Sequence, residues 1–103
     1  MSRKLLCIFL LFTVNIFAQN QGNLSGRVID SETGFGLEGA TIQIQNSDFY
    51  TITDQNGNFK IADIPTSSFN VTASFIGFKS QTKFNVIVKS AGNQSLQYIL
   101  NPS

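Results

Sequence analysis

Histidine and tryptophan are absent from this 103-residue sequence, and it contains a single cysteine. Without histidine, the chain lacks the usual general base for a serine nucleophile and a principal zinc ligand. We therefore expect no catalytic residue, no metal ligand and no cofactor. Because one cysteine cannot form a disulfide within the chain, the hydrophobic core alone must stabilise the fold.

Charge is also scarce: charged residues make up 13% of the chain, and the formal net charge is +1. Acidic and basic residues nearly cancel beyond the amino-terminal segment, and no basic stripe is visible along the sequence. Proteins that bind nucleic acid usually carry such a stripe or patch. We therefore expect no nucleic-acid partner.

The amino terminus has the pattern of an export signal. A basic start precedes an apolar run over residues 5–14, which Asn15 interrupts. A membrane-spanning helix needs roughly 18 or more apolar residues, so a membrane anchor is the less favoured alternative. We predict a signal peptide over residues 1–18, with cleavage between Ala18 and Gln19, and export to the periplasm or outer membrane.

Cys7 lies inside the apolar run, and Lys4-Leu5-Leu6 stand directly ahead of it instead of small residues. That spacing does not match a lipid attachment site, so we interpret Cys7 as an apolar residue lost with the signal. A mature chain without cysteine fits a bacterial periplasm better than an animal extracellular space.

Residues 19–103 are long enough for one domain and too short for two. Apolar and polar residues alternate in several short runs, for example at Leu96, Tyr98 and Leu100, and no window has a helical period. This alternation is typical of strands with one buried face. We expect an all-β fold, a seven-stranded antiparallel β-sandwich. The expected strands cover residues 24–29, 40–44, 50–53, 59–61, 69–75, 78–88 and 96–100.

The segment Asp54-Gln55-Asn56-Gly57 has strong turn chemistry. An aspartate can accept backbone N–H groups there, and Asn and Gly tolerate positive φ. We predict a β-hairpin at this turn and a similar turn over residues 30–34. Asp54, Asn56 and Asn58 also resemble the start of a calcium loop, but an EF-hand needs glycine sixth and glutamate twelfth. Since glycine stands fourth and proline twelfth, the turn interpretation is favoured over a loosely held surface calcium.

Several spaced blocks resemble the carboxypeptidase regulatory-like domain over roughly residues 22–90. The resemblance implies a transthyretin-like (prealbumin-like) sandwich of immunoglobulin-like architecture, often found after the signal peptide of SusC-type TonB-dependent outer-membrane receptors. The blocks are Gly26-Arg27-Val28-Ile29-Asp30, Thr33-Gly34, Leu37-Glu38-Gly39-Ala40-Thr41-Ile42, Thr53-Asp54-Gln55-Asn56-Gly57-Asn58-Phe59 and Ser74-Phe75-Ile76-Gly77-Phe78. We expect their conspicuous members to hold the fold rather than a site: Gly26, Asp30, Gly34, Gly39, Ala40, Thr53, Asp54, Gly57, Phe59 and Gly77.

The sequence departs from the receptor members of that family in small ways and in one large way. Gly36 stands where many have proline, and Phe78 where many have tyrosine. The 103 residues are too few for a plug and a barrel. We therefore expect an accessory module, or a fragment of a receptor, rather than a transporter.

Two classes of function remain open. The first is a monomeric docking module for an outer-membrane receptor or another envelope protein, which could use the sheet edges expected at residues 78–89 and 95–100. Lysines along the first of these segments could instead protect the edge. The second is an independent secreted module that binds protein or glycan. Its only plausible sugar platform is Tyr50 with Phe49, beside Asn46 and Asp48, because Tyr98 falls on the apolar face of its strand.

Overall fold

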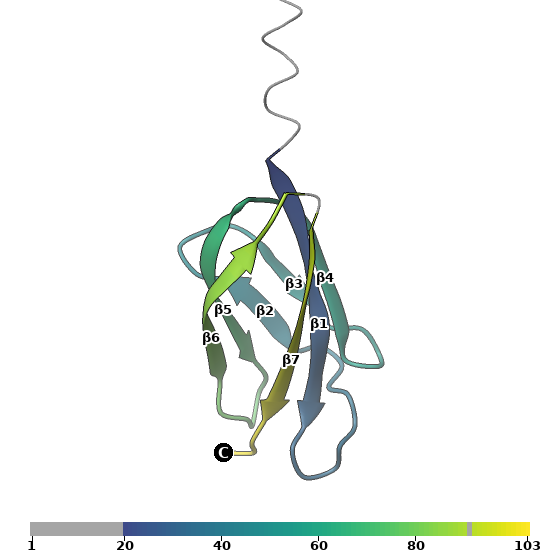
Figure 1. Ribbon diagram of the computed structural model, residues 1–103. Coiled ribbons are helices and arrows are strands. Elements are labelled where there is room, and N and C mark those ends of the chain that lie inside the picture. The colour runs from purple at the N-terminus through teal and green to yellow at the C-terminus, as the bar shows by residue number, and fades with distance from the viewer. Residues whose placement is uncertain (1–19, 91) are drawn as a thin grey trace, which may run out of the picture.

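The computed structural model describes residues 20–90 and 92–103, so the expected signal peptide and the Ala18–Gln19 junction lie outside the described residues. The described chain folds into seven strands in two sheets (Figure 1). This arrangement confirms the expected all-β sandwich. The strands are β1 (Gln21–Asp30), β2 (Thr41–Ile44), β3 (Tyr50–Ile52), β4 (Asn58–Pro65), β5 (Ser67–Ser74), β6 (Gln81–Val88) and β7 (Asn93–Leu100).

The three-stranded sheet has the order β4-β1-β7, and the four-stranded sheet has the order β3-β2-β5-β6. Both segments expected to form sheet edges therefore do so, as β6 and β7. The remaining edges are β3 and β4. β6 and β7 belong to different sheets but lie side by side (Figure 1). The sandwich therefore has a seam where these two edges face each other.

One strand pair departs from the expected antiparallel arrangement. β1 and β7 run parallel, in register from Asn23 opposite Asn93 to Asp30 opposite Leu100. A tight turn forces its two strands to be antiparallel, but these strands are the first and last of the domain and no turn joins them. The described chain therefore enters at one pole of the sandwich and leaves at the other (Figure 1).

The predicted hairpin at Asp54 is wrong. The turn is present, but β3 before it belongs to the four-stranded sheet and β4 after it belongs to the three-stranded sheet. The residues of this turn correctly predicted that the chain reverses direction here. It could not specify whether the strands on either side pair with each other or with other strands.

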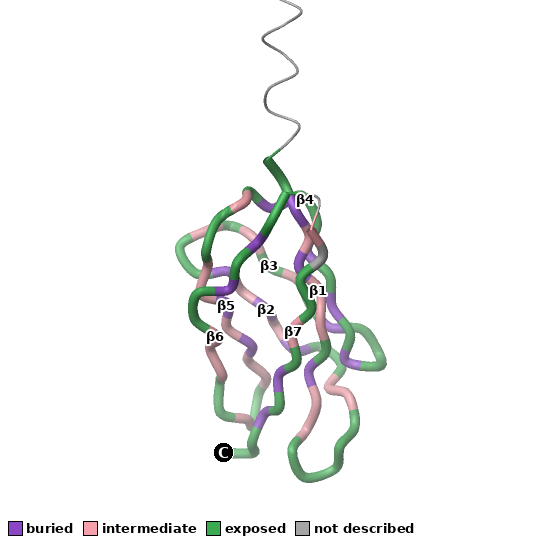
Figure 2. The backbone as a smooth tube through the Cα atoms, in the orientation of Figure 1, coloured by how far each residue is buried: buried purple, intermediate pink, exposed green. Residues whose placement is uncertain are grey.

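The core lies between the sheets, and buried residues recur in alternation along the strands (Figure 2). Tyr98 is fully buried, as its place on an apolar strand face predicts. Within residues 20–90 and 92–103, no helix has the length and apolar character needed to cross a membrane. The buried core residues are Leu24, Val28, Ala40, Ile42, Ile44, Phe59, Ile61, Ile64, Val71, Ala73, Val86, Val88, Tyr98 and Leu100.

Candidate docking surfaces

Thr53 joins two segments of the chain through its buried hydroxyl. The hydroxyl donates to the carbonyl of Leu37 and accepts the N–H of Ala40 at 2.8 Å. The backbone N–H of Thr53 donates to the carbonyl of Ala40 at 2.9 Å, and its own carbonyl accepts the N–H of Gly39 at 3.1 Å. This network fixes the entry into β2 against the end of β3. These hydrogen bonds tie Thr53 to Leu37, Gly39 and Ala40.

Asp54 and Gly57 shape the turn that crosses between the sheets. One carboxylate oxygen of Asp54 accepts the N–H groups of Asn56 and Asn58, each at 2.9 Å. Gly57 has φ of 80°, in the left-handed region that favours glycine. A Cβ at Gly57 would collide with the carbonyl oxygen of Val28, so this turn packs directly on β1.

The other motif residues are spread over the domain. Gly26 leaves room for the Phe59 ring, whose nearest atom would lie 2.7 Å from a Cβ at that position. The carboxylate of Asp30 caps its own turn by accepting the N–H of Glu32 at 2.8 Å. Gly34 and Gly77 have φ of 76° and 84° in open turns. The ten residues therefore do not converge on one site, and among the described residues no three His, Cys, Asp or Glu side chains gather to hold a metal ion.

The seam between β6 and β7 is closed at both ends. At one end Phe78 forms an antiparallel bridge with Pro102. At the other end a Cβ on Gly22 would collide with the carbonyl oxygen of Lys89, which shows how closely the end of β6 crosses the start of β1. Between these closures lies an open groove of about 590 Å³.

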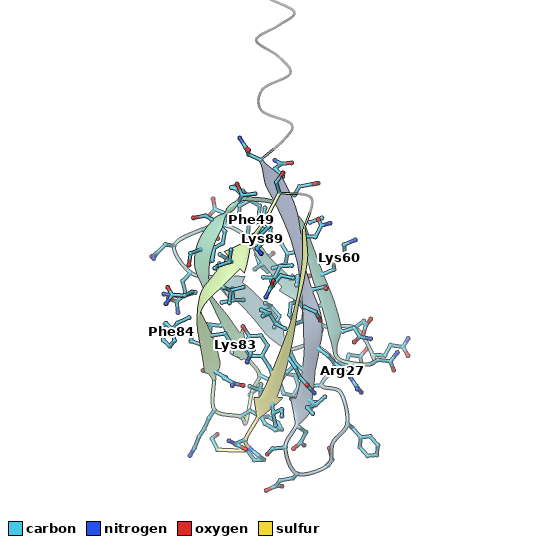
Figure 3. The ribbon with its side chains drawn as sticks, viewed as in Figure 1. Arg27, Phe49, Lys60, Lys83, Phe84 and Lys89 are labelled. Carbon is cyan, nitrogen blue, oxygen red and sulfur yellow. The ribbon has the colours of Figure 1, made fainter. Side chains whose placement is uncertain are left out.

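We call this groove the β6–β7 seam. It is lined by lysine, amide and apolar side chains, with no acidic residue among them. Phe84 is 68% exposed and Ile87 is 54% exposed. Phe84 points away from the sandwich, whereas Lys83 on the adjacent position points toward β7 (Figure 3). The seam is lined by Lys83, Phe84, Asn85, Val86, Ile87, Lys89 and Gln94.

The side chain of Lys83 is half-buried and lies over the core. Its Nζ atom is 5.3 Å from the centroid of the Tyr98 ring, and the Tyr98 hydroxyl donates to the carbonyl of Val71 at 2.6 Å. Burial raises the pKa of Tyr98 above its usual range, because the phenolate would lose its hydration. A lysine that points inward from an edge strand opposes the addition of another strand. Between the two roles that the sequence left open for Lys83, the geometry favours edge protection.

Two further features hinder the addition of a strand to the β6 and β7 edges. Asn85 has φ of 57° beside a register shift in the β5–β6 pair, which interrupts the ladder of β6. On β7, the N–H of Ile99 already donates to the side-chain oxygen of Gln81 at 3.3 Å. A partner is therefore more readily held by side chains of the seam than by a continuous added strand.

A second surface is the outer face of the four-stranded sheet. The strand register places Tyr50, Gln43, Thr72 and Thr82 in one row across all four strands. The hydroxyls of Thr72 and Thr82 are 2.8 Å apart. The residues that the register and the burial pattern assign to this face are all uncharged: Thr41, Gln43, Tyr50, Ile52, Ser68, Thr72, Ser74, Thr82 and Ile87.

The structure separates the two aromatic residues of the expected sugar platform. Tyr50 is 62% exposed on the outer face. Phe49 is only partly exposed and packs against the hydrophobic core. The amide of Gln43 donates to the carbonyl of Phe49 at 3.2 Å and so orders the loop that holds it. Sequence periodicity could not find this difference, because residues 45–49 belong to no strand.

The comparisons with known proteins match nearly all of the described domain. The CarboxypepD_reg-like domain family matches residues 24–103. Carboxypeptidase D of Rattus norvegicus is 35% identical over 80 residues, which are 78% of this chain and 6% of that protein. TonB-dependent receptor P3 of Formosa agariphila is 30% identical over 79 residues, which are 77% of this chain and 8% of that protein. The chain thus spans a small part of the curated relatives that it matches.

Solved structures share the fold at low sequence identity. The type II cohesin–X-dockerin complex of Acetivibrio cellulolyticus contains a chain with a TM-score of 0.64 and 18% identity, over 77% of this chain and 56% of that one. A Bacteroides uniformis protein, provisionally described as carbohydrate-binding, has a TM-score of 0.59 and 14% identity, over 78% of this chain and 41% of that one. These likenesses support a β-sandwich, and the family match goes further: the chain belongs to the CarboxypepD_reg-like domain family.

Proposed function

We propose that this β-sandwich module docks onto an envelope protein through the β6–β7 seam, and that its partner is a TonB-dependent outer-membrane receptor. The observation that carries the docking role is the seam itself, where Phe84 and Ile87 are exposed beside Lys83 and Lys89. Exposed aromatic groups that a partner can desolvate supply much of the energy of protein interfaces. The similarity to TonB-dependent receptor P3 supports the choice of partner.

Export is part of this proposal. The domain over residues 19–103 would reach the periplasm or outer membrane after cleavage between Ala18 and Gln19. Intact-mass measurement of the protein recovered from the envelope tests this step. A mass that begins at Gln19 supports it, whereas retention of residues 1–18 in a membrane fraction would favour an anchor.

Docking can be tested by photo-crosslinking in the envelope of the source organism. A photoreactive residue at Phe84 reports on the seam, and one at Gln97 is the matched control. Gln97 is exposed on β7 and lies opposite Arg27 on the outer face of the three-stranded sheet. We expect an adduct with a TonB-dependent receptor from Phe84 and none from Gln97. An adduct with a different envelope protein would refute the receptor but not the seam, and equal labelling from both positions would refute the seam.

The outer face of the four-stranded sheet supports a second candidate, an independent module that binds a neutral glycan. Tyr50 stands beside an amide and hydroxyls in one row, and the face is uncharged. Exposed aromatic rings can stack on apolar surface while neighbouring amides and hydroxyls form hydrogen bonds. The fold similarity to the Bacteroides uniformis protein is compatible with this candidate.

Titration of the labelled protein with neutral oligosaccharides, followed by NMR, tests glycan binding. We expect shifts at Tyr50, Gln43 and Thr72, and we expect Tyr50→Ala to remove them. Phe35→Ala is the control, because Phe35 is 75% exposed but lies in the loop after β1. Shifts that survive Tyr50→Ala would exclude this face as the binding surface.

A further inference from the structure

The first and last strands of the domain are neighbours and run in the same direction. Eight residue pairs align them, from Asn23 with Asn93 to Asp30 with Leu100. At about 3.3 Å per residue, the overlap is roughly 25 Å long. The chain enters at the start of β1 and leaves at the end of β7, at opposite poles of the sandwich (Figure 1).

This geometry determines how the domain responds to tension between its ends. A pull on both ends acts along the strands and tends to slide β1 past β7. All hydrogen bonds of the β1–β7 ladder are then loaded together. If the two strands were instead pulled apart at one end, the bonds would break one after another, and each is weak by itself. The same ladder therefore resists sliding far better than peeling.

Backbone hydrogen bonds extend the ladder beyond the paired residues. The N–H of Asn23 donates to the carbonyl of Gly92 at 3.0 Å, and the N–H of Ser31 donates to the carbonyl of Leu100 at 2.9 Å. β1 is the central strand of its sheet, so a second ladder with β4 holds its other edge in place.

The last residues are also fastened to the loop between β5 and β6. The N–H of Ser103 donates to the carbonyl of Gly77 at 2.9 Å, and the N–H of Lys79 donates to the carbonyl of Asn101 at 2.8 Å. Tension on the carboxyl end therefore meets these bonds before it reaches the ladder.

Side chains oppose sliding as well. Val28 on β1 lies opposite Tyr98 on β7, and both are fully buried. If β7 slid by two residues, the Tyr98 hydroxyl would leave the carbonyl of Val71, its hydrogen-bond acceptor. A buried hydroxyl without a partner is costly, so the core locks the register of the two strands.

From these observations we infer that the domain is a force-bearing element, in which the β1–β7 ladder carries tension along the chain in shear. This mechanical function goes beyond docking and does not depend on the identity of a partner. It suits a module placed in series within an assembly that is pulled during its work.

Single-molecule force spectroscopy on the full chain tests the inference. Cys7→Ser removes the natural thiol, and introduced cysteines serve as attachment points. Gln21→Cys with Asn101→Cys loads the β1–β7 ladder in shear. Gln21→Cys with Gln94→Cys pulls the same strands apart at one end, since Gln94 lies opposite Leu24. All three attachment residues are exposed.

We expect the shear pair to unfold at about threefold higher force than the peeling pair at the same pulling rate, because forced unfolding depends on the barrier that the load encounters. Equal thermal midpoints of the two variants would show that the attachment sites leave stability unchanged. If either variant is destabilised, Asn20→Cys with Ser103→Cys provides a second shear pair for the same comparison. Equal or lower force in the shear geometry would overturn the inference.

Discussion

The Nζ atom of Lys83 lies 5.3 Å from the centroid of the Tyr98 ring, across the boundary between the two sheets. Lys83 pairs with Val71 on β5, and that register turns its side chain inward. Tyr98 comes from β7 of the other sheet. One cation therefore covers the core at the open seam and also places a charge where an added strand would need an apolar residue.

Lys83→Met should lower stability and increase self-association. Loss of the cation–π contact should cost about 0.5 to 1 kcal/mol, and loss of the inward charge should leave the edge of β6 easier to pair. Urea unfolding and sedimentation velocity measure the two effects. Lys79→Met is the control, because Lys79 is exposed outside the strands. If Lys83→Met stays monomeric and as stable as the control, neither role is correct.

The buried phenol of Tyr98 should make stability fall at alkaline pH. Its pKa in the folded chain is raised above the ordinary value of 10.0 because burial disfavours the phenolate. The unfolded chain releases this proton near the ordinary value, so the contribution is complete below about pH 10 and is lost as the pH rises further. Tyr98→Phe should cost about 1 kcal/mol at neutral pH, through the bond to Val71, and should flatten the alkaline decline. Urea unfolding at about pH 8 and about pH 11 measures both effects, and an unchanged decline in Tyr98→Phe would contradict the assignment.

Substitution by alanine should lower stability by different amounts at two glycines with positive φ. Gly34→Ala meets open space, so it should cost only the backbone strain of about 1 to 2 kcal/mol. Gly57→Ala adds a collision with the carbonyl of Val28, and overpacking should raise its total cost to about 3 kcal/mol or more. Chemical denaturation measures the difference. Equal costs would mean that the turn does not pack on β1.

Thr53→Val should lower the stability of the fold more than its small change in shape suggests. It removes the hydroxyl that pairs with Leu37 and Ala40, so a partly buried carbonyl and a buried N–H lose their partner. We expect a loss of about 2 to 3 kcal/mol. Thr51→Val on β3 makes the same chemical change at a partly exposed position and should cost little. Similar urea midpoints for the two variants would contradict a structural role for the Thr53 hydroxyl.

The sequence was sufficient for the fold class, because alternation at positions such as Tyr98 reports directly which face of a strand is buried. The edge positions of β6 and β7 were also predictable. Strand direction was less accessible: the parallel β1–β7 pair joins segments about 70 residues apart, and local pattern carries no signal for such a pair. The same limit explains why the turn at Asp54 suggested a hairpin although its flanking strands lie in different sheets.

The candidate surfaces were less predictable than the fold. Lysines along the β6 segment were visible in the sequence, but the inward direction of Lys83 depends on the irregular register of β6 against β5. Likewise, Tyr50 and Phe49 are adjacent, yet only Tyr50 belongs to a strand whose register exposes it. Exposure of a single side chain follows from tertiary pairing, which a single sequence does not determine.

The last prediction concerns chemistry at Asp54, the most suggestive acidic residue in the sequence. Its Oδ1 atom already accepts two backbone N–H groups of the turn, which leaves one oxygen for a cation. A calcium site needs six or more oxygen ligands. We therefore expect calcium and zinc to leave the melting temperature unchanged. Because the sequence contains no histidine, we also expect that the purified protein hydrolyses no peptide, ester or glycoside. Asp54→Ala should lower stability by about 1 kcal/mol, through loss of the turn bonds, without altering any activity. A metal site would stabilise by about 2.7 kcal/mol at a hundredfold excess over Kd, so a clear thermal shift that disappears in Asp54→Ala would establish a cation site at this turn.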